Sequence, residues 1–311
     1  FKFFFYLVEY IKFTKCKVVI TFVDNMFIYY ELKKYLKSTK FIAVQNGLRT
    51  QFFFEELKKR KNLEIDHFFA LNTVYAKKYE NYIKSNYHMS GSYIANEIPL
   101  VFKKSNHVNY ISSGPDDTEG FVKIYGSKKI CQSDYYEPEV FVLHILKKFC
   151  LNNNLELNIL GRAKSFKGKK LEKLFYSKIL GNYNYNFLSF NRENKKDSYI
   201  KCDNAELNVC IYSALGLETL SRLSKTFIFN LREAATDYPS LNIFWPMKVP
   251  SEGEFWTSTK NENEILKKLE KIKNIKNSNW KILLKDKYHI LTSSDSNNKK
   301  FSSVLRSIIN E

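Results

Sequence analysis

The chain has 311 residues, a length that supports a hydrophobic core in each of two α/β domains. Its 50 Lys and Arg outnumber 32 Asp and Glu, which gives a formal net charge of +18, and 44% of its residues are hydrophobic. No apolar stretch reaches the roughly 18 residues that a membrane-spanning helix requires, and the aromatic start lacks the cleavage site of a signal peptide. The sequence therefore predicts a cytoplasmic protein without a membrane-spanning helix.

The first part of the chain alternates helices with strands, which is typical of a parallel sheet with helical crossovers. Because the sequence enters a helix and a strand at once, we expect the beginning of the first domain to lie outside it. The predicted strands are residues 18–23, which we expect to be buried, 40–45, 66–71 and 87–90. The predicted helices are residues 1–13, 27–36, 51–61 and 73–85.

The alternation pauses between Ser92 and Asn106, a polar segment with Pro99 and a Lys pair, and then restarts. The predicted strands of the second part are residues 108–112, 156–160, 187–190, 209–212 and 226–229. The predicted helices are residues 140–152, 171–179, 197–202, 217–223, 263–274 and 301–309, and the predicted loops include 273–279 and 295–300. The sequence thus predicts two Rossmann-like α/β domains, residues 1–106 and 107–311.

The stretch from Val209 to Asn230 reads as strand, tight turn, helix and strand. A strand that turns through Ser213 and Gly216 into a helix presents backbone N–H groups and the positive end of the helix dipole, which together bind phosphate. Glu218 could accept hydrogen bonds from ribose hydroxyls beside that phosphate. The alternative is an ordinary βαβ unit whose closely packed glycine binds nothing.

Polar residues also follow the strands of the first part, at the edge where open α/β sheets bind ligands. Asp24, followed by Asn25, could act as a general base or simply cap a helix. The next strand ends in Gln45, Asn46 and Gly47. Gly47 permits a positive φ, and we expect Arg49 to project into the cleft and bind an anion there.

The second part offers further candidates at its strand ends. Ser113 and Gly161 would let a phosphate approach closely, and Arg162 would point a guanidinium at the same edge. Glu97, near the end of the first part, is a second candidate base. Asp116-Asp117 falls in a predicted loop, and no DxD motif follows a strand, so we predict no metal ion.

The five cysteines show no CxxC pairing and no His at metal-ligand spacing, which predicts reduced thiols, most of them buried, and no cofactor. They are Cys16, Cys131, Cys150, Cys202 and Cys210. The spread of lysine along the chain is explained by codon usage or by weak attraction to an anionic membrane surface. Without a known motif or an Arg stripe, we predict no specific nucleic-acid partner.

Four segments resemble proteins of surface-carbohydrate (capsule and lipopolysaccharide) biosynthesis. S-A-L-G-L-E-T-L-S-R is similar to their S-x-L-G-x-E-x-L-x-R, and F-I-A-V-Q-N-G-L-R to I-x-x-Q-H/N-G. Met89 to Asn96 resembles their G-S-x-x-N element, and Gly253 to Trp256 their G-x-F-W element, whose aromatic pair could instead pack between domains. The resemblance implies two domains that face a cleft, as in glycosyltransferases of the GT-B type.

For function, the resemblance implies a metal-independent glycosyltransferase. A nucleotide-sugar donor would bind at Ser113, Gly161, Arg162, Ser213, Leu215, Gly216 and Glu218. A glycan or lipid-linked glycan acceptor would bind near Asp24, Asn25, Gln45, Asn46, Gly47 and Arg49. Where many relatives carry His, this chain has Asn46, so a histidine base there is excluded. A nucleotide-sugar epimerase, a polyol-phosphate transferase and a non-catalytic nucleotide-sugar or nucleic-acid-binding protein are the alternatives.

Overall fold

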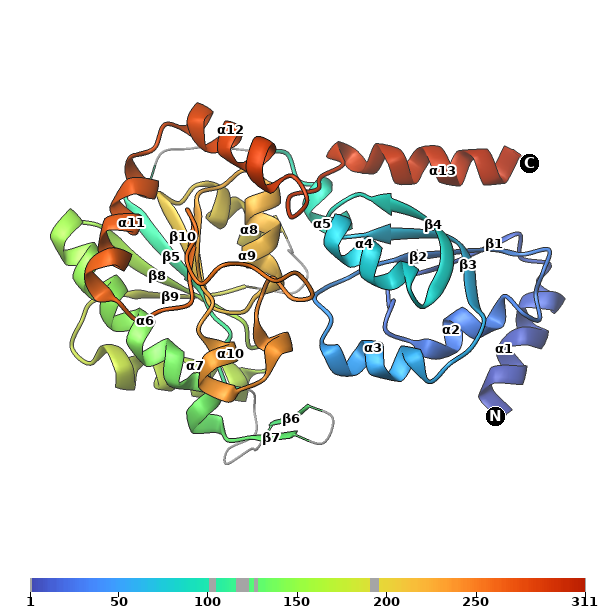
Figure 1. The fold of residues 1–311 in the computed structure, drawn as a ribbon, viewed down its shortest axis with the longest axis horizontal. Coiled ribbons are helices and arrows are strands. Elements are labelled where there is room, and N and C mark those ends of the chain that lie inside the picture. The colour runs from blue at the N-terminus through green and yellow to red at the C-terminus, as the bar shows by residue number, and fades with distance from the viewer. Residues whose placement is uncertain (1, 101–104, 116–122, 126–127, 191–195, 311) are drawn as a thin grey trace. The chain divides into compact units, whose positions relative to one another are not determined.

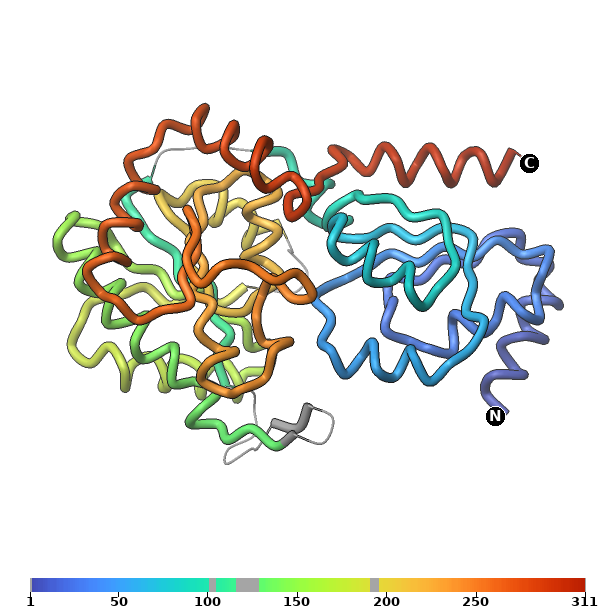
Figure 2. The backbone as a smooth tube through the Cα atoms, viewed as in Figure 1, coloured from blue at the N-terminus to red at the C-terminus, as the bar shows by residue number. Residues whose placement is uncertain are grey.

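The computed structural model describes residues 2–100, 105–115, 123–125, 128–190 and 196–310 (Figure 1). The chain forms two compact units, which we treat separately. Unit 1 contains Phe1–Ile98 and His289–Glu311, and unit 2 contains Pro99–Tyr288. The trace in Figure 2 leaves unit 1, runs through unit 2 and returns to unit 1 for the last helix. The predicted second domain was residues 107–311, whereas in the structure residues 289–311 belong to unit 1.

Unit 1 is built on a parallel sheet with the strand order β1-β2-β3-β4. Its strands are β1 (Val18–Thr21), β2 (Lys40–Val44), β3 (Leu63–Ala70) and β4 (Ile83–Met89). Its helices are α1 (Lys2–Phe13), α2 (Phe27–Leu32), α3 (Gln51–Lys58), α4 (Thr73–Glu80), α5 (Tyr93–Asn96), the 3-10 helix η2 (Ser296–Asn298) and α13 (Lys299–Asn310).

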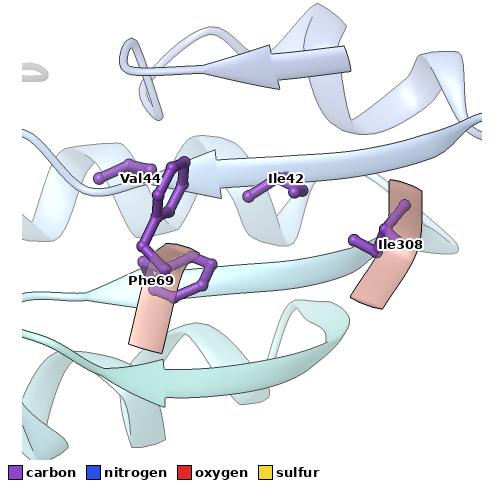
Figure 3. Close-up of a cluster of buried hydrophobic side chains, with 5 residues drawn as sticks. Ile42, Val44, Phe69 and Ile308 are labelled. Atoms are coloured by element: carbon purple, nitrogen blue, oxygen red, sulfur yellow. The ribbon is translucent and has the colours of Figure 1, made fainter. Parts of the chain in front are cut away.

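The helix α13 joins unit 1 through an apolar cluster on the sheet. Phe301 and Ile308, about two turns apart on α13, pack against Ile42, Val44 and Phe69 of β2 and β3 (Figure 3). The burial of such side chains contributes roughly 1.5–3 kcal/mol each, which explains why a segment more than 200 residues from the sheet in sequence returns to it.

Unit 2 is built on a second parallel sheet with the strand order β12-β11-β10-β5-β8-β9. Its strands are β5 (His107–Ile111), β8 (Glu156–Gly161), β9 (Asn186–Ser189), β10 (Leu207–Cys210), β11 (Thr226–Phe229) and β12 (Trp256–Thr257). The strands β6 (Lys123–Tyr125) and β7 (Lys128–Ile130) pair antiparallel in a separate two-stranded sheet.

The helices of unit 2 connect these strands. They are α6 (Gln132–Asn153), α7 (Phe166–Leu180), α8 (Lys196–Asp203), α9 (Ala214–Ser221), α10 (Arg232–Thr236), η1 (Pro239–Leu241), α11 (Glu262–Asn274) and α12 (Asn277–Tyr288). The chain adds β8 and β9 on one side of β5 and then β10, β11 and β12 on the other. The strand order therefore reverses between β5 and β10, and such a reversal opens a crevice at the carboxyl ends of the strands.

A ladder of four asparagines, three of them buried, fixes the register of this sheet. The Nδ2 of Asn109 donates to Asn208 at 3.1 Å, that of Asn158 to Asn109 at 3.3 Å, and that of Asn186 to Asn158 at 3.0 Å. The four residues lie at paired positions on β5, β10, β8 and β9. Because a buried amide without a partner is costly, a slip of any strand would break this row of bonds.

Several sequence expectations differ from the structure. Strand β1 is an edge strand, partly exposed rather than buried, with Ile20 36% exposed. The predicted helix 73–85 ends at Glu80, because the residues from Ile83 onward pair with β3. The predicted loop 273–279 contains the start of α12, and 295–300 contains η2 and the start of α13. The Phe255–Trp256 pair packs within unit 2, against Trp280 and Tyr288.

All five cysteines are free thiols; three are buried, and Cys16 and Cys131 are exposed. In the part of the chain that the structure describes, no helix has the length and apolarity needed to cross a membrane.

Candidate functional site

The crevice edge of unit 2 collects four strand ends. Ser112, Ser113 and Gly114 follow β5, and Ser213 follows β10, so these two groups flank the reversal of strand order. Gly161 ends β8, and Arg232 comes three residues after β11. Because all of these strands are parallel, their carboxyl ends lie along one edge of the sheet, which is where ligands bind in open α/β folds.

Helix α9 begins directly at the end of β10. A Cβ on Gly216 would come within 2.2 Å of Cys210 Sγ, so only glycine allows the helix to pack this closely on its strand. The cap residue Ser213 has an extended backbone, and its side chain makes no capping hydrogen bond. Leu215 is half-buried in the first turn. The start of α9 thus presents the positive end of its dipole to the crevice.

Glu218 lies one turn into α9 and is half-buried. Its Oε2 accepts a hydrogen bond from the hydroxyl of Tyr199, on α8, at 2.7 Å. This bond fixes the direction of the Glu218 carboxylate. The contact of Glu218 with a ribose remains a prediction.

A buried cluster joins the ends of β5 and β11. Ser113 donates to Glu139 Oε1 at 2.9 Å, and Arg232 Nη2 donates to Ser113 Oγ at 3.0 Å. Arg232 and Glu139 form an ion pair in which both side chains are 0% exposed. Burial raises the pKa of Glu139, and the Glu139 carboxylate raises the pKa of Arg232 against the opposing effect of its burial. The guanidinium stacks on Tyr135, 4.0 Å from the ring centroid.

A second buried carboxylate, Glu172 of α7, organises the ends of β5 and β8. It accepts backbone N–H bonds from Arg162 at 2.9 Å and from Ala163 at 2.8 Å, and a hydrogen bond from the hydroxyl of Ser112. A Cβ on Gly161 would lie 2.7 Å from the ring of Phe187, so glycine is required here by close packing. The backbone of Arg162 is therefore fixed, while its side chain is exposed at the predicted edge.

In unit 1, the corresponding edge carries a closed polar network around Asp24. Its carboxylate, 0% exposed, accepts bonds from Asn46 N at 3.0 Å, Arg49 Nε at 3.0 Å and Tyr79 Oη at 2.6 Å. A further bond joins Arg49 Nη2 to Asn46 Oδ1 at 2.6 Å. The expectation that Arg49 binds an anion in the cleft therefore needs correction, because this guanidinium is buried against Asp24. The same geometry favours a positioning role for Asp24 over that of a base.

The remaining candidates of unit 1 are divided between buried and exposed positions. Gln45 is buried, where its side chain donates to Gly47 O and accepts from Leu71 N. Gly47 does not use the positive φ that glycine permits, since only Gly91 and Gly181 among the described glycines adopt one. Asn25 and Glu97 are exposed. Neither Asp24 nor Asn25 caps α2, whose cap residue is Met26.

Three residues of this edge, Glu139, Glu172 and Arg232, were not predicted from the sequence. The sequence could have indicated Arg232, because this residue follows a β-rich run by only three residues. The two glutamates lie inside helices, far from any motif. Within the described ranges, no group of three or more His, Cys, Asp and Glu side chains could hold a metal ion. Asp116-Asp117 lies outside the described residues.

Residues 42–309 match a protein family described as "putative O-antigen biosynthesis protein". A search of curated protein sequences returns no match.

Solved structures with a similar fold include proteins from bacteria and an archaeon. A "putative UDP-N-acetylglucosamine 2-epimerase from Listeria monocytogenes" has a TM-score of 0.57 at 10% identity, with 99% of this chain and 79% of that chain covered. A Rickettsia africae glycosyltransferase has a TM-score of 0.52 at 9% identity, with 99% and 81% covered. The Methanocaldococcus jannaschii UDP-GlcNAc 2-epimerase, in complex with UDP-GlcNAc and UDP, has 0.50 at 13%, with 98% and 79% covered. At these identities the similarity shows the fold alone, a GT-B-like α/β fold with two parallel sheets, which confirms the predicted fold class.

Proposed function

The chain belongs to the family described as putative O-antigen biosynthesis proteins, and from this premise we propose that it is a glycosyltransferase with a nucleotide-sugar donor. The observation that carries the proposal is the edge of unit 2 at the reversal of strand order. There the start of α9, the Ser112–Gly114 turn and the Gly161–Arg162 turn lie on neighbouring strand ends. A nucleotide with two phosphates fits such an edge because N–H groups and a guanidinium bind anions.

We assign the donor to unit 2 in the following way. The diphosphate would bind at Ser213, Leu215 and Gly216 of α9, with Ser113 and the Gly161–Arg162 turn beside it. Glu218 would accept hydrogen bonds from the ribose. When the sugar is transferred, negative charge develops on the leaving nucleotide, and fixed N–H groups and Arg162 would stabilise it without a metal ion.

We assign the glycan acceptor to unit 1. Glu97 is exposed after β4, whereas Asp24 is buried, which makes Glu97 the better placed of the two candidate bases. Asp24 would instead hold Asn46 and Arg49 in place through its hydrogen bonds. The enzyme would work in the cytoplasm, and its net charge of +18 would favour peripheral contact with anionic lipid, close to a lipid-linked acceptor.

Ligand binding followed by turnover tests this function. Thermal shift with UDP, GDP, CDP and CMP should identify the nucleotide, because a ligand that binds only the folded state raises the unfolding temperature. The matching nucleotide sugar is then incubated with and without extracted glycan acceptor, in the presence and absence of EDTA.

We expect sugar transfer that requires acceptor and persists in EDTA. Isomerisation of the donor sugar without acceptor would replace the transferase with an epimerase. Loss of activity in EDTA with recovery in Mg²⁺ would contradict the role given to Arg162, and stabilisation by none of the four nucleotides would overturn the proposal.

A further inference from the structure

We propose that Arg232 is a positioning residue of the donor site, which holds Ser113 in place and supplies buried positive charge beneath the subsite for the donor's diphosphate. The inference rests on the proposed function and adds to it a residue that no sequence motif indicated. It starts from the hydrogen bond between Arg232 Nη2 and Ser113 Oγ, at 3.0 Å.

This hydrogen bond places the guanidinium beneath the crevice. Arg232 follows β11, and Ser113 follows β5, with β10 between these two strands in the sheet. Because neighbouring strands lie about 4.8 Å apart, the side chain must extend across the end of β10. A second observation agrees: burial raises the pKa of Cys210, the last residue of β10, to about 12, and the nearby Arg232 opposes this rise. Helix α9 begins only four residues beyond Cys210.

The hydrogen-bonding capacity of Arg232 is only partly used by its surroundings. Its Nη2 is paired with Glu139 and Ser113, and Tyr135 stacks on it, but Nε and Nη1 are buried and form no hydrogen bond within the described residues. Buried N–H groups without a partner are uncommon in folded proteins. By contrast, Nε, Nη1 and Nη2 of Arg49 all donate hydrogen bonds. Glu139 Oε2 is also buried without a hydrogen bond, so the ion pair is incompletely satisfied on both sides, and Arg232 contributes a local positive potential on the side of the start of α9.

A diphosphate is the part of a nucleotide sugar that would respond to this potential. Charges interact more strongly in a buried, weakly polar environment than in water, so a fixed cation under the start of α9 adds to the helix dipole there. An uncharged nucleoside would not sense it. The preference for UDP over uridine, measured as the ratio of their affinities, is therefore the signature of this role, and a merely structural residue would not change it.

The test is isothermal titration of UDP and uridine into wild type, Arg232→Met, Arg232→Lys and Glu139→Gln. We expect Arg232→Met to weaken UDP binding by about tenfold or more and to leave uridine binding unchanged. Arg232→Lys should retain most of the preference because it keeps the charge. Glu139→Gln should strengthen UDP binding, because it removes the compensating carboxylate while keeping its shape and its acceptor oxygen. Opposite changes in UDP affinity for Arg232→Met and Glu139→Gln would show that the charge of Arg232, and not its packing, sets the preference.

A matched pair of the same unit provides the control. Arg222 and Asp203 form another buried ion pair, but Asp203 lies just before the start of β10, at the opposite edge of the sheet. Arg222→Met combined with Asp203→Asn should leave the preference for UDP over uridine unchanged. If Arg232→Met does not fold, Arg232→Met is introduced into Glu139→Gln, where it should again weaken UDP binding by about tenfold.

Two results would overturn the inference, and they differ in meaning. If wild type binds UDP but the Arg232 variants keep the same preference over uridine, Arg232 has no part in the site and the proposed function stands. If wild type binds none of UDP, GDP, CDP and CMP, the assigned donor site is wrong and the inference falls with it. If it binds another of these nucleotides instead of UDP, that nucleotide and its nucleoside replace UDP and uridine in the titration.

Discussion

The two sheets of this protein each carry a buried arginine–carboxylate pair beside their strand ends, and the two pairs differ in how completely they are satisfied. In unit 1, Asp24 and Arg49 share their bonds with Asn46 and Tyr79, so the network is closed. In unit 2, two nitrogens of the guanidinium at the strand ends have no partner in the described part of the chain. A closed network fixes two loops, whereas an open one indicates a place for a charged ligand.

The strand orders lead to the same distinction. The described strands of unit 1 follow one another from β1 to β4, so no reversal opens a crevice among them, whereas unit 2 reverses its direction between β5 and β10. An arginine that follows a strand is thus no sufficient sign of an anion site. The two edges differ in the topology of their sheets and in whether the buried guanidinium has N–H groups without a hydrogen-bond partner in the described part of the chain.

Arg49→Met should produce the largest effect on stability. Removing one partner of a buried ion pair leaves Asp24 without its counter-charge, which costs about 3–5 kcal/mol of the free energy of unfolding. All three tryptophans, Trp245, Trp256 and Trp280, lie in unit 2. In a urea titration we therefore expect circular dichroism to show the loss of stability in unit 1, while the unfolding transition seen by tryptophan fluorescence shifts less.

The control for this variant is Lys12→Met, which removes an exposed pair with Glu9 in the same unit and should cost less than about 1 kcal/mol. Equal losses for the two variants would show that the Asp24–Arg49 network is not the structural anchor of this edge.

Glu97→Gln should reduce sugar transfer by about 10²-fold or more while leaving nucleotide binding intact, because the variant removes the proposed general base. Asp24→Asn is the comparison within the same unit. Since Asp24 is buried, we expect this variant to lower stability and to retain transfer in the molecules that stay folded. Measured kcat values for both variants, each corrected for its folded fraction, decide the matter. Loss of transfer in Asp24→Asn, with transfer retained in Glu97→Gln, would restore Asp24 as the base.

Glu218→Ala should weaken binding of the preferred nucleotide by about 1.5–3 kcal/mol, the usual contribution of hydrogen bonds to a charged acceptor. Tyr199→Phe removes only the hydroxyl that donates to Glu218, and should change the affinity much less. Titration calorimetry on both folded variants compares them directly. An unchanged affinity for Glu218→Ala would remove this residue from the site.

Gly216→Ala and Gly47→Ala compare one glycine from each unit. An added Cβ at Gly216 meets Cys210 Sγ at 2.2 Å, and such overpacking costs about 1–3 kcal/mol and displaces the start of α9. The nearest atom to a Cβ at Gly47 is 3.7 Å away, an ordinary contact. We expect thermal unfolding to show a loss for Gly216→Ala, together with weaker nucleotide binding, and almost none for Gly47→Ala. A larger loss at Gly47 would contradict this account of close packing.

Local patterns carried most of the prediction from sequence. The order strand, turn, helix and strand in the 209–230 stretch was predicted, and β11 was predicted with its bounds, because its strands are short apolar runs. The bounds of β10 and α9 were placed too late, since α9 already begins at Ala214 and includes Gly216. The start of α12 was missed, because lysine and asparagine suggested a loop. The return of α13 to unit 1 was not visible, since it depends on contacts of Phe301 with residues more than 200 positions away.

The candidate site was predicted only where a side chain belongs to a strand end. Glu139 and Glu172 were missed because a glutamate inside a helix normally faces water, and only the assembled sheet shows that these two are buried beneath it. Arg49 was placed at the right edge, but its partner Asp24 precedes it by 25 residues, and the sequence alone did not pair them.

Hydrogen–deuterium exchange with and without the preferred nucleoside diphosphate tests the central claim most directly, because it locates the ligand without any substitution. We predict slower exchange in unit 2, in peptides that cover residues 112–114 and 211–218, and no change in unit 1 for residues 22–25 and 45–49. Protection confined to the unit 1 peptides, or bound nucleotide with no protection at 211–218, would contradict the assignment of the donor site to the edge of unit 2.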